Sequence, residues 1–134
     1  MKINTNLAQW EKRVISFKFI YSCLISELNK NEILEKYDFE IKYLKNDYLD
    51  NIIFFFVENK DKMFEQISNL LESNWTIERV NLIDLSIVCC TISEKNVHQI
   101  DKKILIDQAV ITAKKYGDEN SYKFVNSILD KILT

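Results

Sequence analysis

The chain has 134 residues and a net charge of −2, and 47% of its residues are hydrophobic, with one glycine and no proline. This length is enough to bury a core within one domain, and the scarcity of turn-forming residues favours helices over a turn-rich sheet. The acidic balance argues against a strongly basic nucleic-acid-binding protein, and no stretch has the apolar length of a membrane span or a secretion signal. We therefore expect one all-α domain over residues 1–134, in the cytoplasm.

The first twenty residues are basic although the whole chain is acidic. Lys2, Lys12, Arg13 and Lys18 against Glu11 give this segment a charge of +3, which leaves −5 for the other 114 residues. A basic end on an acidic body is possible, but phosphate binding would rest on few cations, which predicts weak binding by this chain alone. For Lys12 and Arg13 the alternative interpretation is a solvated helix face.

The N-terminal region predicts a long amphipathic helix. Large apolar residues recur in steps of three and four, and Thr5 or Asn6 is available as the N-terminal cap. The members of this stripe are Leu7, Trp10, Val14, Phe17, Tyr21, Leu24 and Leu28. A short helix is expected to follow near Asn31 to Tyr37, and then a connection.

The middle of the chain contains two strongly apolar stretches. Residues 48–57 are apolar on nearly every side, so periodicity alone permits a strand or a buried helix, and the all-helical context favours the helix. Helical spacing resumes at Met63 after an expected break at residues 58–61. Residues 82–94 are mostly apolar, as is typical of a central helix. We expect a long loop over residues 93–103.

The last third, residues 104–132, predicts two helices joined by a short corner. Gly117, the only glycine, stands just past the first of them and suits a left-handed stop, which a residue without Cβ adopts most easily. Asp118, Asn120 and Ser121 then offer capping oxygens for the second helix. The corner is expected to determine how the two apolar faces meet.

The cysteines and the single histidine do not predict a chemical centre. Cys23, Cys89 and Cys90 form an odd count, and the adjacent pair is poorly placed for a structural bridge, so we expect reduced, buried thiols. His98 has no metal ligand at a typical spacing, and we expect neither a metal nor a cofactor. Cys90 with His98 is the one nucleophile and base pair to consider, but nothing places the two together. We therefore expect no enzyme.

Three blocks in the last third carry a distinctive pattern: DQAV at residues 107–110, AKKYG at 113–117 and SYKFVNSILD at 121–130. This pattern resembles the C-terminal signature of the NusB family of transcription antitermination factors, whose members usually have NEAV, then AKxFG, then FVNGVLD. The resemblance extends through the middle of the chain, where the matching residues are Trp75, Arg79, Asp84 and Glu94.

The resemblance implies a NusB-like fold of about seven helices in two packed helical sub-bundles, acting as an RNA-binding module. Members of the family bind the boxA element of nascent RNA together with the small-subunit ribosomal protein NusE, and support antitermination by the transcription elongation complex at ribosomal RNA operons. The residues that would contact RNA by this resemblance are Lys2, Lys12, Arg13 and Lys103. The residues that would contact the protein partner are Tyr21, Asp84, Tyr116, Asn120 and Phe124.

Two interpretations of the function stay open. The family has an arginine-rich start to the first helix, whereas this chain keeps Lys12 and Arg13 and has no cation at residues 9–11. This reduction favours a structural or protein-interaction module that has lost independent RNA binding. The positive charge of the leading segment favours retention of RNA binding.

The proposed partner residues also have simpler interpretations when the family is set aside. Tyr116 and Phe124 lie at the rims of their apolar stripes and fit a core as well as an interface. Asp84 fits an acidic residue at a helix N-terminus, and Asn120 fits a helix cap. The structure decides where each of these side chains lies.

Overall fold

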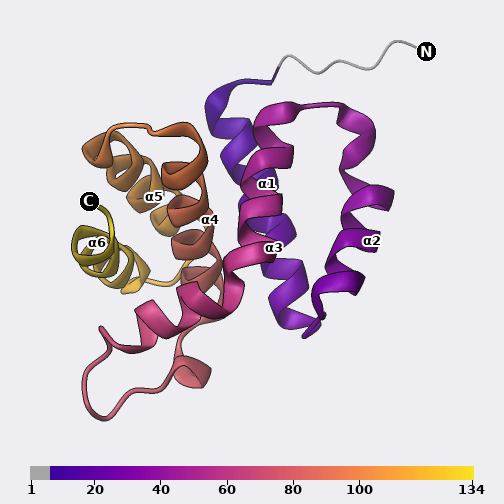
Figure 1. Cartoon of the computed structure of the whole chain (residues 1–134). Helices are drawn as coiled ribbons and strands as arrows, with labels where there is room; N and C mark the ends of the chain where they lie inside the picture. The colour runs from indigo at the N-terminus through magenta and orange to yellow at the C-terminus, as the bar shows by residue number, and fades with distance from the viewer. Residues whose placement is uncertain (1–6) are drawn as a thin grey trace.

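The computed structural model describes residues 7–134, and within them every regular element is helical (Figure 1). The predicted all-α class is confirmed. Six α-helices and two short 3-10 helices are close to the predicted seven helices. In chain order the elements are α1 (Gln9–Ile25), α2 (Lys30–Glu40), η1 (Lys42–Leu44), α3 (Asp47–Ser68), η2 (Ile77–Arg79), α4 (Leu82–His98), α5 (Lys102–Tyr116) and α6 (Ser121–Ile132).

Helix α4 is the centre of the fold. It packs against α1 and α3 on one side and against α5 and α6 on the other, so it joins the two groups of helices seen in Figure 1. Every residue from 84 to 94 is buried. The buried hydroxyls of Ser86, Thr91 and Ser93 each donate to a backbone carbonyl four residues earlier, which removes most of the cost of burying them. The predicted central helix is confirmed.

Two predicted interruptions are wrong. Helix α3 runs without a break through residues 58–61, because Val57 and Met63 are both buried and the charged residues between them turn outwards. Helix α4 continues to His98, so the expected loop over residues 93–103 shrinks to residues 99–101. Its polar last turns stay helical because their side chains have partners inside the protein.

The N-terminal helix begins differently from the prediction. Thr5 and Asn6 lie outside the described residues, and α1 begins after Ala8, whose N–H donates to the Glu11 carboxylate at 3.2 Å. The predicted short helix near residues 31–37 is confirmed as α2. Its cap, Asn29, exchanges hydrogen bonds with Glu32 in a reciprocal capping box.

The corner between α5 and α6 needs glycine for space rather than for a left-handed backbone. Gly117 has φ −91° and is extended, so the predicted left-handed stop is wrong. A Cβ on this residue would lie 2.3 Å from Ser121 Oγ and 2.8 Å from the carbonyl oxygen of Ala113. Asp118 and Ser121 supply the corner's hydrogen bonds, whereas the side chain of Asn120 makes no cap bond.

Candidate functional site

Arg13 is held inside the protein by an ion pair between α1 and α4. Its Nε lies 2.9 Å from Glu94 Oε1, and its Nη2 lies 2.9 Å from Glu94 Oε2. The two side chains are 14% and 1% exposed, and the Tyr48 hydroxyl also donates to Glu94. Burial alone would lower the pKa of Arg13, but hydrogen bonding and the charge of Glu94 outweigh it and raise the pKa. The guanidinium is therefore committed to the fold.

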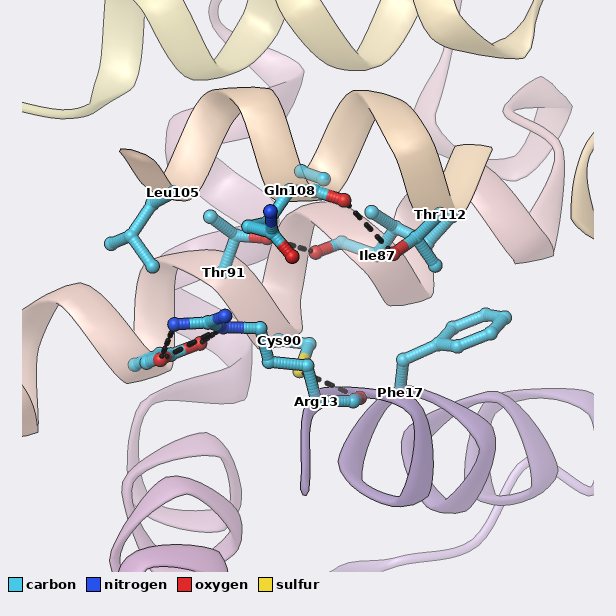
Figure 2. A pocket seen from close by; sticks show the side chains of 10 residues that line it. Arg13, Phe17, Ile87, Cys90, Thr91, Leu105, Gln108 and Thr112 are labelled. Carbon is cyan, nitrogen blue, oxygen red and sulfur yellow. Dashed lines mark hydrogen bonds and ion pairs between the residues drawn. The ribbon is translucent and has the colours of Figure 1, made fainter. Parts of the chain in front are cut away.

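A cavity of about 20 Å³ lies beside this ion pair (Figure 2). Phe17 of α1 and Gln108 and Thr112 of α5 line it together with Arg13 and Cys90. A cavity of this size accommodates a water molecule and no larger ligand. It is a gap in the packing between α1, α4 and α5 and not a substrate pocket.

The thiols are buried and reduced, as predicted. Burial raises the pKa of Cys23 to about 11 and that of Cys89 to about 12, and it raises the pKa of Cys90 as well. Cys90 contacts the carbonyl of Arg13, whereas the His98 ring stacks on Tyr48 with 3.6 Å between centroids. Cys90 and His98 are eight positions apart on α4, about 12 Å along the axis. The two side chains do not form a catalytic pair.

The other predicted RNA contacts have separate local partners. Lys12 Nζ lies 2.9 Å from Gln9 Oε1 and 5.0 Å from the centre of the Tyr48 ring. Lys103 pairs with Asp107 one turn further along α5, at 3.0 Å. Lys2 lies outside the described residues. Lys12 thus lies against Tyr48, whose hydroxyl donates to the carboxylate that holds Arg13, whereas Lys103 has its own partner on α5.

Tyr116 joins the closing pair of helices to α1. Its ring packs against Phe17, with 5.4 Å between centroids, and lies near the ammonium groups of Lys18 and Lys115 at 5.0 and 5.5 Å. Tyr21 is half-buried one helical turn after Phe17, on the same side of α1. Two of the predicted partner residues thus lie along one flank of α1.

Asp84 lies beneath the corner between α5 and α6 and not on an exposed face. It is 6% exposed at the start of α4, and one of its carboxylate oxygens has no hydrogen-bond partner within the described residues. Asn120 is exposed at this corner, and its N–H donates to Asp118 Oδ1 at 2.8 Å. The structure gives Asp84 a role in supporting the start of α6.

Phe124 lines an open groove of about 350 Å³ between α6 and the loop that follows α3. Leu71 and Trp75 form part of the opposite wall, and the Trp75 side chain is 50% exposed. The groove combines aliphatic and aromatic side chains with lysines at its edge, which is the composition of many protein interfaces.

A second groove was not foreseen from the sequence. It has a volume of about 480 Å³ and lies between the end of α1, the second half of α3 and the start of α4. Ile25, Phe64 and Leu82 are among its lining residues, and Ile25 is 55% exposed. Ile25 lies one turn after Tyr21, so the groove continues the flank of α1 that carries Tyr21. In the sequence, the signal for this groove is Ile25, a hydrophobic residue that lies outside the apolar stripe of α1.

Within residues 7–134, no group of three or more His, Cys, Asp and Glu side chains is arranged to hold a metal ion. No helix in this part of the chain has both the length and the apolar character needed to cross a membrane.

Comparison with known protein families identifies this arrangement. The model of the NusB family matches residues 11–134, which is nearly the whole of the described structure. The chain belongs to the NusB family. The resemblance found in the C-terminal blocks is thereby confirmed.

Curated relatives and solved structures agree with this assignment. The transcription antitermination protein NusB of Borreliella burgdorferi is 33% identical over 130 residues, covering 92% of each chain. The NusB protein of Clostridium botulinum strain Kyoto is 39% identical over 106 residues, covering 76% of this chain and 73% of that protein. This places the chain among transcription antitermination factors, which are not an enzyme family, as predicted.

The solved structures confirm the NusB fold. T. maritima NusB has a TM-score of 0.74 and 28% identity, and the match covers 98% of this chain and 92% of that one. A conserved hypothetical protein from Mycoplasma genitalium with structural homology to NusB proteins has a TM-score of 0.70 and 25% identity. It covers 95% of this chain and 100% of its own.

Asp84 is expected to make the stability of this NusB-family chain depend on pH. Burial raises its pKa; a hydrogen bond from Ser121 partly opposes this, and the charge of Asp118 adds to it. Because the folded state then binds the proton more tightly than the unfolded chain, the contribution of Asp84 to stability increases as pH falls below neutral. Urea unfolding of the wild type and Asp84→Asn at several pH values measures this difference. A wild type that loses stability relative to Asp84→Asn on acidification contradicts the assignment.

Proposed function

We propose that this chain is a cytoplasmic transcription antitermination factor that binds boxA-type RNA jointly with the ribosomal protein NusE at ribosomal RNA operons. The family match over residues 11–134 carries the proposal. Joint binding follows from the charge, because a chain with a net charge of −2 makes few phosphate contacts by itself. A partner that adds its own contacts to the same RNA raises the affinity of the assembly without a change in either protein.

The flank of α1 that carries Tyr21 and Ile25 supports the protein half of this proposal. It exposes aliphatic and aromatic side chains over a groove, and such side chains are enriched at the cores of protein interfaces. Tyr116 continues this flank through its contact with Phe17. We assign NusE to this surface, with Asn120 and Phe124 at the corner that follows Tyr116.

The substitution Ile25→Glu is expected to weaken capture of purified NusE at least about tenfold, because it places a charge in an apolar interface. Phe39→Glu is the matched control, since Phe39 is also a large exposed hydrophobic residue, 88% exposed, but lies on α2. Biolayer interferometry with immobilised NusE compares the two variants. If Ile25→Glu binds NusE as tightly as the control does, and Phe124→Ala also keeps wild-type affinity, the proposed partner surface is wrong.

The RNA half of the proposal assigns phosphate contacts to Lys2, Lys12 and Lys103. Arg13 contributes indirectly, by fixing the part of α1 that carries Lys12. The second candidate function is a NusB-like interaction module that keeps its protein partner without binding RNA. The ion pair of Arg13 with Glu94 favours this alternative, since it occupies the one arginine that α1 has retained.

A further inference from the structure

Four lysines on α1, α5 and α6 lie over aromatic rings. We call this set the lysine–aromatic surface. Its members are Lys18, Lys114, Lys115 and Lys123 with Trp10, Tyr116 and Tyr122. The lysines are exposed and the rings half-buried.

The cation–ring distances connect the surface from α1 to α6. Lys115 Nζ lies 4.6 Å from the centre of the Trp10 ring and 5.5 Å from that of Tyr116, which Lys18 approaches to 5.0 Å. On the other side of α5, Lys114 Nζ lies 4.9 Å from the centre of the Tyr122 ring. The two sets of contacts meet at Lys114 and Lys115, which are neighbours on α5.

The lysines of this surface take no part in the ion pairs of the protein. Within residues 7–134, none of the four ammonium groups forms an ion pair with a carboxylate. Lys102 and Lys103 at the start of α5 do form such pairs, with Asp130 and Asp107. The end of α5 therefore brings lysines without an ion pair close to one another, whereas those at its start are paired.

An open groove runs along the same surface between α5 and α6. Its volume is about 690 Å³, and Ile111, Tyr122 and Asn126 line it together with Lys114 and Lys123. Asp107 also lines the groove, and its carboxylate is paired with Lys103. Ile111 of α5 is 50% exposed, and it lies one helical turn before Lys114 and Lys115. The groove thus combines a ring, an aliphatic side chain, an amide for hydrogen bonding and two lysines.

We propose that the lysine–aromatic surface binds single-stranded RNA, with phosphates on the four lysines and a base against the Tyr122 ring. This rests on the proposed function and adds a second group of residues to the RNA contacts assigned there to Lys2, Lys12 and Lys103. An unpaired base presents a flat apolar face and a nearby anion, and rings with adjacent lysines complement both groups. An acidic protein would also meet the lysines, but it would gain little from half-buried aromatic rings. The surface compensates for arginines missing from the start of α1.

The test replaces Lys18, Lys114, Lys115 and Lys123 by glutamine together. Fluorescence anisotropy of a labelled single-stranded boxA-type RNA is measured with the full chain and NusE over a series of salt concentrations. The variant is expected to bind at least about tenfold more weakly at moderate salt, with a log–log salt slope smaller by about 3, since each lost phosphate contact removes ~0.7.

The matched control removes the same charge from α2, η1 and α3. It replaces four other exposed lysines by glutamine: Lys30, Lys42, Lys45 and Lys62. Wild-type RNA affinity and salt slope are expected for this control. Equal losses in both quadruple variants would show a net-charge effect and overturn the proposal.

Tyr122 tests the contact with the base separately from the phosphates. Tyr122→Leu is expected to weaken binding at least about fivefold without changing the salt slope, because stacking does not displace counterions. Tyr122→Phe keeps the ring and is expected to bind as the wild type does. If Tyr122→Leu bound the RNA as tightly as the wild type, no base would stack on this ring. That part of the proposal would be overturned.

The remaining outcomes separate this inference from the proposed function. If wild-type chain and NusE bind the RNA and the surface variant binds within twofold, the surface is wrong and the proposed function stands. If the wild-type pair does not bind the RNA, both proposals fall. If the surface variant loses NusE but the complex that still forms keeps its RNA affinity, the surface belongs to the protein partner, and the RNA assignment is overturned.

Discussion

Replacing Arg13 by methionine is expected to lower the free energy of unfolding by about 3–5 kcal/mol, the cost of leaving a buried charge without its partner. Glu94 is 1% exposed, and its charge is balanced inside the protein by the guanidinium of Arg13. Methionine keeps much of the side-chain volume, so the loss reports on charge more than on packing. Urea denaturation followed by circular dichroism measures it.

The double variant Arg13→Met with Glu94→Gln is the decisive control. It removes both charges while leaving an acceptor for the Tyr48 hydroxyl, and it is expected to recover most of the lost stability. A single variant that stays within about 1 kcal/mol of the wild type would show that the ion pair is dispensable. A loss of RNA binding in an Arg13 variant would therefore report on folding. A Lys12 variant tests the contact with RNA directly.

Gly117→Ala is expected to lower the free energy of unfolding by about 2–3 kcal/mol, towards the upper end of the usual cost of overpacking. The added Cβ would lie 2.4 Å from Ser121 Cβ and 2.8 Å from the Ala113 carbonyl oxygen, and both neighbours are fixed in helices. The corner must open to relieve this contact. Because Asp84 lies against Ser121, the start of α4 is expected to loosen with it.

The matched control for the corner is Asn126→Ala, an exposed position on α6 where alanine meets no such crowding. It is expected to leave the urea midpoint unchanged or slightly raised, since alanine is the better helix former. If Gly117→Ala were as stable as this control, the corner would have room for a side chain, and the explanation from space would fail.

The sequence predicted the helices well where apolar periodicity decides, and poorly where buried polar residues do. The central helix was predicted from its run of apolar side chains over residues 82–94. Its continuation to His98 was not, because the partner of Glu94 is Arg13, 81 positions earlier in the chain. A local pattern carries no information about a contact made over such a distance. Gly117 was correctly singled out, but for a backbone conformation that it does not adopt.

The candidate site shows the same division. Tyr116 was correctly identified as a residue between core and surface, since its place at the rim of a helical stripe is visible in the sequence. Arg13 was taken for a surface cation, because a basic residue on a helix is usually solvated. Lys18 and Lys115 belong to helices far apart in the chain, so their shared contact with Tyr116 appears only when α1 and α5 pack together.

Titration of boxA-type RNA with this chain, with NusE and with both together tests the central claim most directly. We expect the pair to bind at least about tenfold more tightly than either protein alone, since two sets of contacts act on one strand. A scrambled RNA of equal length is expected to lose this gain. A pair that forms but binds boxA-type RNA no better than its separate members would contradict the proposed function and leave the interaction module that has lost RNA binding.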